Sequence, residues 1–443
     1  MALDIGTSSV RAALYDGLAK AVPRAFAKIE RTLTVTADGG AEIDADEAVA
    51  QVASAIDALL ERSDAEIAHV ASCSFWHSLV GVDAKGKPTT KVFGWADTRS
   101  GKYTDQLKNR FEESKTHNRT GAHFHSSFWP AKLLWLRKDF PEVFAKTERW
   151  LSFSDYVALK LFGTATTSVS MASGTGIFDI RKCVWDVDLL RFLKIKPSSL
   201  PAIVDNDTDT FSLNKTYAKR WPRLANAKWF LCVADGAADN IGAGCVTNKQ
   251  AALMVGTSGA MRVAYEGDPP DHVPEGLWCY RVNRKIVVLG GALSDGGNLA
   301  QWMRDNLRLS RDADEIVRQR LGTPSTVKIV PFFNGERSTG YNESATGAIA
   351  GLTAAHDAYD VYRAAMEAVA ERFAGILSRL ETVFKIEHII ASGGALRESP
   401  VWTEIISNSL NRPLTMSEAR ESSSRGAVLL ALTGSNIQNE QSI

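Results

Sequence analysis

The sequence predicts an α/β protein with two domains, each carrying one turn that suits a phosphate group. At 443 residues the chain is too long for a single ordinary hydrophobic core. Near its start stands Asp4-Ile5-Gly6-Thr7-Ser8-Ser9-Val10-Arg11, and its second half contains Val255-Gly256-Thr257-Ser258-Gly259-Ala260-Met261-Arg262. Both segments have a Gly-Thr-Ser turn, an arginine, and then an apolar run that ends in an acidic residue and a glycine. Two such turns in matching contexts indicate a duplicated domain, which is the outline of a two-domain phosphotransferase.

The bulk composition excludes several classes of partner. Apolar residues make up 45% of the chain and charged residues 23%, as in soluble globular proteins. The formal net charge is zero and there is no basic tail or stripe, so neither nucleic acid nor a membrane surface is expected as a partner. An anionic ligand must then be held by local geometry.

The cysteines and the apolar segments point to a reducing compartment. The five cysteines are scattered, and no pair has the spacing of metal ligands, so neither a disulfide framework nor a zinc site is expected. There is no signal peptide and no apolar stretch of membrane-spanning length. We expect a cytoplasmic protein.

The first half of the chain predicts three strands, a helix and another strand. Residues 1–16 have the pattern of a hairpin, and residues 28–36 alternate as a third strand does. Apolar residues recur at helical spacing over residues 47–60, and residues 69–73 form an apolar run typical of a strand. This order resembles the core unit of the actin-like (ribonuclease H-like) ATPase fold. Only three residues precede Asp4, so the first strand is expected to be unusually short for a central one.

The second half predicts the same order again. Residues 229–233 are a buried strand, the hairpin around Gly256 follows, and residues 286–289 are a further strand. A long helix is predicted over residues 359–384, followed by a strand over residues 388–391. We therefore expect two domains, residues 1–222 and residues 223–443, with a cleft between them.

The two turns are candidate phosphate-binding loops. Successive backbone N–H groups in a tight turn hold phosphate oxygens well, hydroxyl groups add donors, and glycine lets the backbone come close. Each turn taken alone could equally be an ordinary hairpin turn, and it is the matched pair that favours phosphate. The candidate phosphate-binding residues are Gly6, Thr7, Ser8, Gly256, Thr257 and Ser258.

Two carboxylates, those of Asp4 and Asp235, are candidates for metal binding and for catalysis. Asp4 ends a strand directly before the first turn and could hold Mg²⁺ beside the phosphates, or could simply cap the turn. Asp235 ends the strand over residues 229–233 and is followed by small residues. It suits a general base for a substrate hydroxyl, or the N-cap of a helix, and Asp239 is the competing carboxylate.

Further candidates surround these carboxylates. Gly393 and Gly394 follow a buried strand and would let a flat ring or a phosphate lie on the backbone. Trp76, His77 and Trp95 follow strand-like segments and suit a sugar, although a packed core tryptophan with a satisfied histidine explains them equally well.

Together these segments resemble the FGGY family of carbohydrate kinases over nearly the whole chain. Residues 347–367 fit the C-terminal signature of the family throughout. The N-terminal signature is met only in part: Lys132 to Leu136 fit, whereas Trp129 stands where a small residue or proline is usual. The other similar segments are residues 4–11, 95–99, 235–238, 255–260, 290–302, 331–337, 392–394 and 424–427.

Within the family the chain is most similar to gluconate kinases. The segments that carry this likeness are residues 77–80 and 168–176, together with Asp83, Pro88 and Thr90. Xylulokinases tend to have Gln-Met-His where this chain has Phe75-Trp76-His77, which argues against that branch and bears directly on the sugar pocket.

The resemblance implies a mechanism. ATP would lie across the cleft, with its phosphates on the two turns and its adenosine at Gly393 and Gly394. Arg11 would neutralise phosphate oxygens, Mg²⁺ would lie near Asp4, and Asp235 would take the proton of the attacking hydroxyl. The N-terminal domain would bind the sugar through Trp76, His77 and Trp95, with Asp235 facing it from the C-terminal domain.

Three functions follow from this resemblance. The first is phosphorylation of gluconate to 6-phosphogluconate. The second is a kinase for another sugar or polyol, such as xylulose, ribulose or glycerol. The third is a catalytically silent nucleotide-binding sensor. The expected partners are a small sugar or sugar acid and ATP or ADP, and a homodimer is left open.

Overall fold

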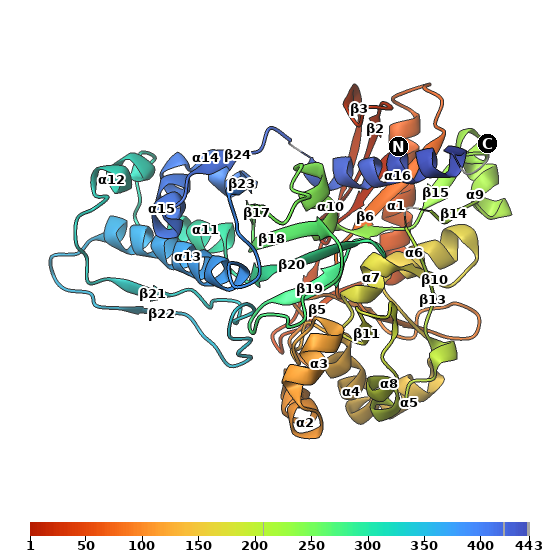
Figure 1. Cartoon of the computed structure of the whole chain (residues 1–443), viewed down its shortest axis with the longest axis horizontal. Helices are drawn as coiled ribbons and strands as arrows, with labels where there is room; N and C mark the ends of the chain where they lie inside the picture. Colours follow the sequence, from red (N-terminus) through yellow and green to blue (C-terminus); the bar gives the residue numbers. More distant parts are fainter. Residues whose placement is uncertain (207, 420, 441–443) are drawn as a thin grey trace.

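Two large β-sheets dominate the computed structural model, which describes residues 1–206, 208–419 and 421–440 (Figure 1). Each sheet is flanked by helices, so the predicted α/β class is confirmed. The sheet that contains the start of the chain lies to the right of the second sheet in this view, and a group of short helices lies below it.

β1 (Ala2–Ile5) is the central strand of the first sheet. It pairs antiparallel with β2 (Ser9–Tyr15) and parallel with β6 (His69–Ser74), and all of its residues are buried. The predicted hairpin is confirmed, and the short first strand is hydrogen-bonded on both sides. The other strands of this sheet are β3 (Ala21–Glu30), β14 (Thr210–Phe211), β15 (Lys228–Phe230) and β16 (Val233–Ala234).

The second sheet repeats the order of the first. β17 (Gln250–Val255) pairs antiparallel with β18 (Gly259–Glu266) and parallel with β23 (His388–Ser392), as β1 does with β2 and β6. The long helix α13 (Ala358–Leu380) precedes β23, in the place that α1 (Ala45–Leu60) has before β6. The topology therefore contains the duplication that the paired turns predicted. The other strands of this sheet are β19 (Trp278–Arg281), β20 (Ile286–Leu293) and β24 (Leu414–Met416).

The strand predicted over residues 229–233 lies in the first sheet, not in the second. β15 and β16 both pair with β6, and Trp229 and Phe230 are buried in the core of that sheet. The first sheet therefore extends to Ala234, and the second begins at Gln250. The predicted division at residues 222/223 does not coincide with this change of sheet.

The third predicted strand also has different bounds. β3 begins at Ala21 and ends at Glu30, earlier than the pattern over residues 28–36 predicts. The chain then leaves the large sheet at the buried Arg31 and enters a small separate sheet. The strands of that sheet are β4 (Thr34–Val35), β5 (Ala41–Ile43) and β8 (Val92–Phe93).

A group of helices inserted between β6 and β15 has a small core of its own. Its central helix is α4 (Trp129–Asp139), whose first two turns are buried, and Trp129 is fully enclosed. The indole N–H of Trp129 donates to the carbonyl of Ser78 at 2.8 Å, so its buried polar group is paired. The helices that share this small core are α2 (Thr104–Arg110), α5 (Pro141–Lys146) and α8 (Val187–Leu193). Further helices of the insertion are α3 (Glu113–Thr120), α6 (Phe153–Phe162) and α7 (Val169–Ser173), of which α6 packs into the core of the first sheet.

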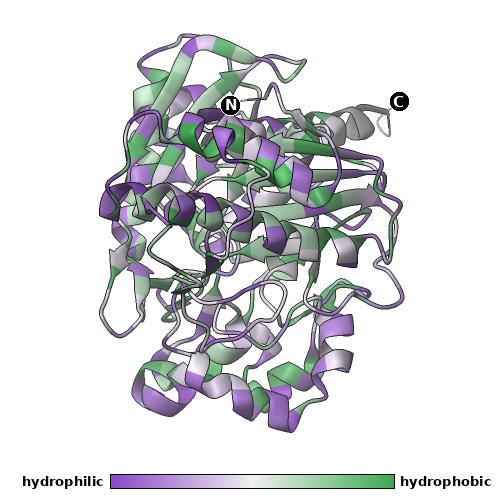
Figure 2. Cartoon of the chain, turned by 90° about the vertical axis from the view of Figure 1, so that its left-hand side faces the viewer, coloured by the Kyte–Doolittle hydropathy of each residue, from purple (hydrophilic) through white to green (hydrophobic). Residues whose placement is uncertain are grey.

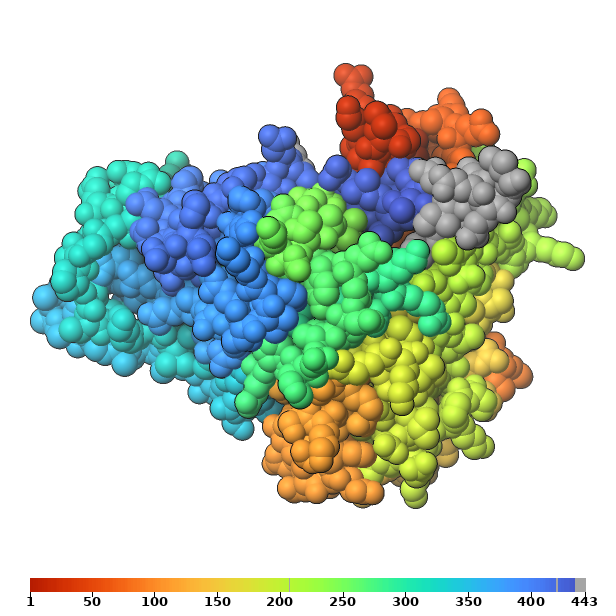
Figure 3. All heavy atoms as spheres, viewed as in Figure 1, coloured from red at the N-terminus to blue at the C-terminus, as the bar shows by residue number. Residues whose placement is uncertain are grey.

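The last helix returns to the first sheet. α16 (Ser422–Glu440) packs against β6 and β1, although it follows the last strand of the second sheet (Figures 1 and 3). It crosses α10 (Asp235–Gly242) at very close range. A Cβ on Gly426 would lie 1.8 Å from the carbonyl oxygen of Ala238, and one on Gly242 would lie 1.8 Å from that of Ser422. The two helices can cross here only because both positions are glycine.

The remaining helices cover the second sheet and the surface. Hydrophilic and hydrophobic residues alternate along the surface helices, as expected for helices with one buried face (Figure 2). In the part of the chain that the structure describes, no helix has both the length and the apolar character needed to cross a bilayer. The further helices are α9 (Lys215–Arg220), α11 (Gly297–Asn306), α12 (Ala313–Gln319), α14 (Gly394–Glu398) and α15 (Pro400–Leu410).

We predict that Gly426→Ala lowers the melting temperature and kcat together. The added methyl group meets backbone rather than a flexible side chain, so the helices must move apart, and overpacking of this kind costs about 1–3 kcal/mol. Gly375→Ala in α13 is the matched control, because its nearest neighbour is the end of Arg379, 3.8 Å away. The control should keep or raise the melting temperature, as alanine is the better helix former. Equal melting temperatures for the two variants in thermal denaturation would contradict the prediction.

Candidate active site

The predicted sugar-site residues meet in one cavity of about 260 Å³ between the two sheets. Trp76, His77 and Trp95 line it from the N-terminal half, and Asp235 and Ser258 from the C-terminal half. Segments far apart in the sequence are thus brought within reach of one small ligand. Trp278 and Tyr280, which the sequence did not single out, also line the cavity, and so do Phe75, Arg262 and Arg337, which lie in segments that the sequence marked but were not assigned to the site.

A second cavity of about 440 Å³ adjoins the first. Gly393 and Gly394 line it together with Arg397, and both cavities share Asp239 and Met254. A ligand bound on Gly393 and Gly394 in the larger cavity would therefore reach the smaller cavity at Asp239 and Met254. This arrangement suits transfer of a group from a molecule in the larger cavity to one in the smaller.

Asp235 is the first residue of α10, directly after the short strand β16. The N-cap is Ala234, so Asp235 is not the capping residue that its sequence context also allowed. Its Oδ1 accepts a hydrogen bond from the N–H of Gly236 at 2.6 Å. Burial, and then the charge of Asp4, raises the pKa of Asp235 to about 7, against the opposing effect of Arg262. A carboxylate with a pKa near the working pH suits a general base.

Asp239, the competing carboxylate, is engaged by other groups. It lies one helical turn after Asp235 and is buried. Arg262 forms an ion pair with it at 3.3 Å, and the hydroxyl of Ser422 at the start of α16 donates to it. A carboxylate held by two partners is a poor proton acceptor, so the geometry favours Asp235 as the base.

Aromatic rings form one wall of the first cavity. Trp278 and Tyr280 stack with centroids 4.5 Å apart, and the ring of Trp76 meets that of Tyr280 edge-on at 5.0 Å. Among the described residues, the buried Nε1 of Trp278, the hydroxyl of Tyr280 and the Nε of Arg262 have no hydrogen-bond partner. Buried polar atoms are nearly always paired, so this wall is suited to a ligand that brings hydroxyl groups. Trp278 and Tyr280 lie two residues apart on β19, and no local sequence signal marks them.

His77 is held in a strained backbone conformation with its ring facing the cavity. Its φ angle is 67°, in the left-handed region that non-glycine residues rarely adopt. Its Nδ1 lies 2.5 Å from the carbonyl oxygen of Gly174. Burial, and then the charge of Arg337, keeps the pKa of His77 well below its usual value, so the ring is neutral. Nδ1 must then carry the hydrogen, and Nε2 is left as an acceptor.

Trp95 and Arg337 form another part of the cavity wall. The Arg337 guanidinium lies 5.0 Å from the centre of the Trp95 ring. Burial lowers the pKa of Arg337, but the side chain remains a cation at neutral pH. A guanidinium that stacks on an aromatic ring keeps its N–H groups free to bind a carboxylate. Arg337 therefore supplies positive charge at the end of the cavity.

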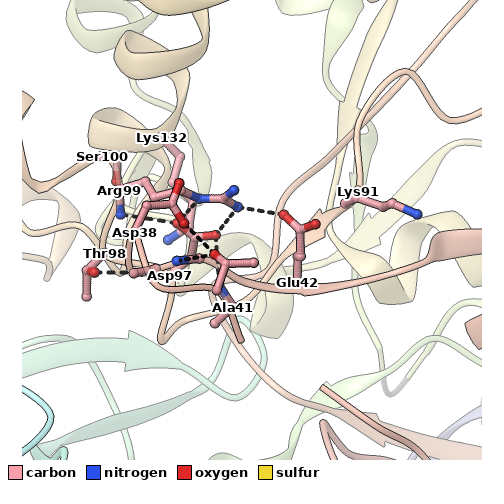
Figure 4. A network of polar contacts seen from close by, with 12 residues as sticks. Asp38, Ala41, Glu42, Lys91, Asp97, Thr98, Arg99, Ser100 and Lys132 are labelled. Carbon is pink, nitrogen blue, oxygen red and sulfur yellow. Dashed lines mark hydrogen bonds and ion pairs between the residues drawn. The ribbon is translucent and has the colours of Figure 1, made fainter. Parts of the chain in front are cut away.

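A polar network fixes the loop that carries Trp95 (Figure 4). The carboxylate of Asp97 accepts from the guanidinium of Arg99 and from the N–H of Ala41 at 3.1 Å. Arg99 also forms an ion pair with Glu42 at 2.7 Å. Asp97 does not line the cavity, so its part in the segment over residues 95–99 is to hold the loop in place.

The two Gly-Thr-Ser turns close their hairpins differently. In the first, the N–H of Gly6 donates to the carbonyl of Ser9, and Thr7 and Ser8 lie at the tip. In the second, the N–H of Gly256 donates to the carbonyl of Ser258. The second hairpin is one residue tighter, because Val255 pairs with Gly259 whereas Ile5 pairs with Val10.

Gly393 lies directly against the second turn. Its φ angle is 104°, and a Cβ at this position would lie 2.1 Å from the carbonyl oxygen of Val255. Both features require glycine here. The Gly-Gly pair thus brings the larger cavity up to the turn that carries Thr257 and Ser258.

Arg11 is held by carboxylates. It forms an ion pair with Asp4 at 3.1 Å and another with Glu421 at 3.4 Å. The resemblance led us to expect it on phosphate oxygens, whereas the structure places it between these two acids. Burial raises the pKa of Asp4, and the charge of Arg11 and a hydrogen bond from Cys73 oppose this rise.

Asp4 is suited to a magnesium ion that is held mostly by other ligands. Within the described residues there is no group of three side chains that could enclose a metal ion. Magnesium at phosphate sites keeps several waters and needs only one or two carboxylates besides the phosphates. The Asp4 carboxylate, which lies close enough to Asp235 for its charge to raise the pKa of that residue, would supply one of them.

Comparison with known proteins identifies the family. The model of the FGGY family of carbohydrate kinases, N-terminal domain, matches residues 1–242, and the model for the C-terminal domain matches residues 251–435. The chain belongs to the FGGY family of carbohydrate kinases. It is therefore a sugar kinase, a phosphotransferase with the two-domain fold of that family.

Individual relatives do not decide the substrate of this FGGY kinase. It is 26% identical to a gluconokinase of Bacillus licheniformis, a match that covers 98% of this chain and 86% of that one. The gluconate kinase and the ligand-bound xylulose kinase of Lactobacillus acidophilus, both solved structures, each match with a TM-score of 0.90 and 28% identity. Each of these two matches covers 98% of this chain and 89% of the other. Proteins named for two sugars are thus equally similar to it.

We predict that Asp235→Asn stabilises this kinase at high pH. The folded-state pKa of about 7 lies above the ordinary value of 3.8, so stability is lost as the pH rises from about 4 to about 7. Asparagine does not ionise and avoids this loss. The melting temperature of the variant should exceed that of the wild type by about 2 °C or more at pH 8 and by clearly less at pH 5. A difference that is absent or independent of pH in calorimetry would contradict the prediction.

Proposed function

We propose that this FGGY kinase transfers the γ-phosphoryl group of ATP to a sugar acid, with gluconate as substrate and 6-phosphogluconate as product. The observation that carries the proposal is the position of Asp235. Its carboxylate lies in a polar aromatic cavity of sugar size, which adjoins the cavity at Gly393 and Gly394. This arrangement supports a base and an acceptor site in the smaller cavity and a donor site in the larger one.

The mechanism follows from this alignment. The adenosine of ATP would lie on Gly393 and Gly394, and its phosphates would lie between the two Gly-Thr-Ser turns. Asp235 takes the proton of a sugar hydroxyl, whose oxygen attacks the γ-phosphorus while the bond to the ADP oxygen breaks. Magnesium, when bound near Asp4, would neutralise phosphate charge. Most of the rate in such transfers comes from positioning and charge neutralisation.

A sugar acid is favoured over a neutral sugar by Arg337. Its guanidinium faces the cavity beside Trp95, and within the described part of the chain no carboxylate forms an ion pair with it. The carboxylate of gluconate would supply the missing partner in a bidentate contact. The alternatives, a kinase for xylulose, ribulose or glycerol, would bring this cation hydroxyl groups but no carboxylate of the substrate.

We predict that Asp235→Asn lowers kcat by about a hundredfold or more, the usual scale of a general acid–base contribution. Asp155→Asn is the matched control. Asp155 is also a buried carboxylate, and burial raises its pKa to about 6, but it caps α6 away from the cavity. The control should keep its turnover per folded molecule, measured as coupled ADP release. Near-normal turnover in folded Asp235→Asn would remove the assignment of the base.

We predict that the wild type turns over gluconate with a higher kcat/KM than xylulose, ribulose or glycerol. In Arg337→Met the KM for gluconate should rise at least about tenfold, the scale of one lost hydrogen bond to a charged group. The KM for neutral sugars should change little, which makes them the internal control. A preference of the wild type for a neutral sugar would overturn the sugar-acid assignment. Nucleotide binding without turnover of any sugar would instead indicate a silent sensor.

A further inference from the structure

Arg31 contacts the carbonyl groups of the first Gly-Thr-Ser turn at two points. Its backbone N–H donates to the carbonyl of Ser8 at 2.8 Å, and its guanidinium NH1 donates to the carbonyl of Gly6 at 2.9 Å. The same guanidinium donates to the side chain of Gln51 at 2.7 Å and to the carbonyl of Ala48 at 3.3 Å. The last two residues belong to α1, so one side chain ties the turn to a helix.

These contacts fix the direction of the N–H groups in the turn. In a planar trans peptide the C=O of one residue and the N–H of the next point to opposite sides. Because the Gly6 carbonyl faces Arg31, the N–H of Thr7 faces away from it, toward the open side of the turn. Among the described residues the Thr7 N–H has no acceptor in the backbone. It is therefore directed outward and available to a phosphate oxygen.

Arg31 is buried, and each of its three guanidinium nitrogens donates a hydrogen bond, which makes it a rigid support. Only 6% of its surface is exposed, and its guanidinium lies 5.2 Å from the centre of the Phe153 ring. Burial lowers the pKa of Arg31 to about 10, so it stays charged at neutral pH. It does not line either of the two cavities and cannot contact a ligand there.

The second turn is held in the same way by other atoms. The carbonyl of Gly256 accepts from the N–H of Gly297 at 2.8 Å, and the carbonyl of Thr257 accepts from the N–H of Asn298 at 3.0 Å. Both donors are backbone groups at the start of α11. In each turn two carbonyl groups thus accept hydrogen bonds from the protein. In the first turn both donors belong to the single residue Arg31.

We propose that Arg31 is a positioning residue for ATP, which orients the first phosphate turn through the carbonyls of Gly6 and Ser8. The inference rests on the proposed function, because it assumes that this turn binds ATP phosphates. Arg31 acts through the turn and does not touch the nucleotide. Its loss should therefore weaken ATP binding without altering the sugar pocket.

The test compares Arg31→Met with Arg31→Lys in the full-length protein. Arg31→Met should raise the Kd for ATP, measured by calorimetry with Mg²⁺ and no sugar, by about tenfold or more, the scale of a lost charged hydrogen bond. The KM for the sugar should stay within about twofold of the wild-type value. Arg31→Lys, which can reach one acceptor but not span to α1, should recover part of the loss.

Arg363→Met is the matched control for the loss of a buried guanidinium. Arg363 is 3% exposed and donates to the carbonyl of Arg320 in the second domain. It should leave the Kd for ATP unchanged even if it lowers the melting temperature. Should Arg31→Met fail to fold, Gln51→Leu removes one brace of the guanidinium and should raise the Kd for ATP by a smaller factor.

The outcomes separate the two proposals. If the wild type binds ATP and Arg31→Met binds it equally well, Arg31 has no positioning role. If Arg31→Met and Arg363→Met weaken ATP binding alike, the effect is general destabilisation and the inference fails. If the wild type itself binds no ATP, the proposed function fails first. Loss of ATP affinity in Arg31→Met alone, with the sugar KM preserved, supports the inference.

Discussion

The site depends on the close crossing of α10 and α16. Gly242 and Gly426 carry no side chain, so the two backbones touch, and the end of the chain is held against the first sheet. The crossing places Asp239 beside Ser422 and presents Asp235 to the cavity. Asp235 is held as well by β16, which pairs with β6, and Asp239 by its ion pair with Arg262. The crossing of two glycines thus acts together with these contacts to position the two carboxylates.

The free-energy cost of burying a charge explains how the charged groups of the site are paired. A buried charge without a partner is unfavourable, so most of the acids and bases here are paired. Asp4 is paired with Arg11, and Asp239 with Arg262. Asp235 faces the cavity, and burial raises its pKa to about 7. Within the described part of the chain, the charged groups that line the first cavity without an ion-pair partner are thus Asp235 and Arg337.

The duplicated halves have diverged in how they hold their turns. The second turn is supported by the backbone at the start of a helix, whereas the first is supported by the backbone N–H and the side chain of one buried residue, Arg31. After β3 the chain enters the small sheet at β4 rather than a helix. Arg31, which is anchored on α1, provides the two hydrogen bonds, one from its backbone N–H and one from its guanidinium. Each half therefore holds the carbonyl groups of its turn with the hydrogen-bond donors that its own topology places beside them.

The sequence by itself determined the fold and the local motifs. The paired turns, the strand and helix periods, and the acid after a buried strand depend on neighbouring residues, so they can be recognised along the chain. Tertiary structure alone decided which side chains meet. It brought Trp278, Tyr280 and Arg337 to His77 and Asp235, moved the strand at residues 229–233 into the first sheet, and engaged Arg11 with two acids. Those outcomes depend on contacts between distant residues and on the burial of charge, which no local pattern records.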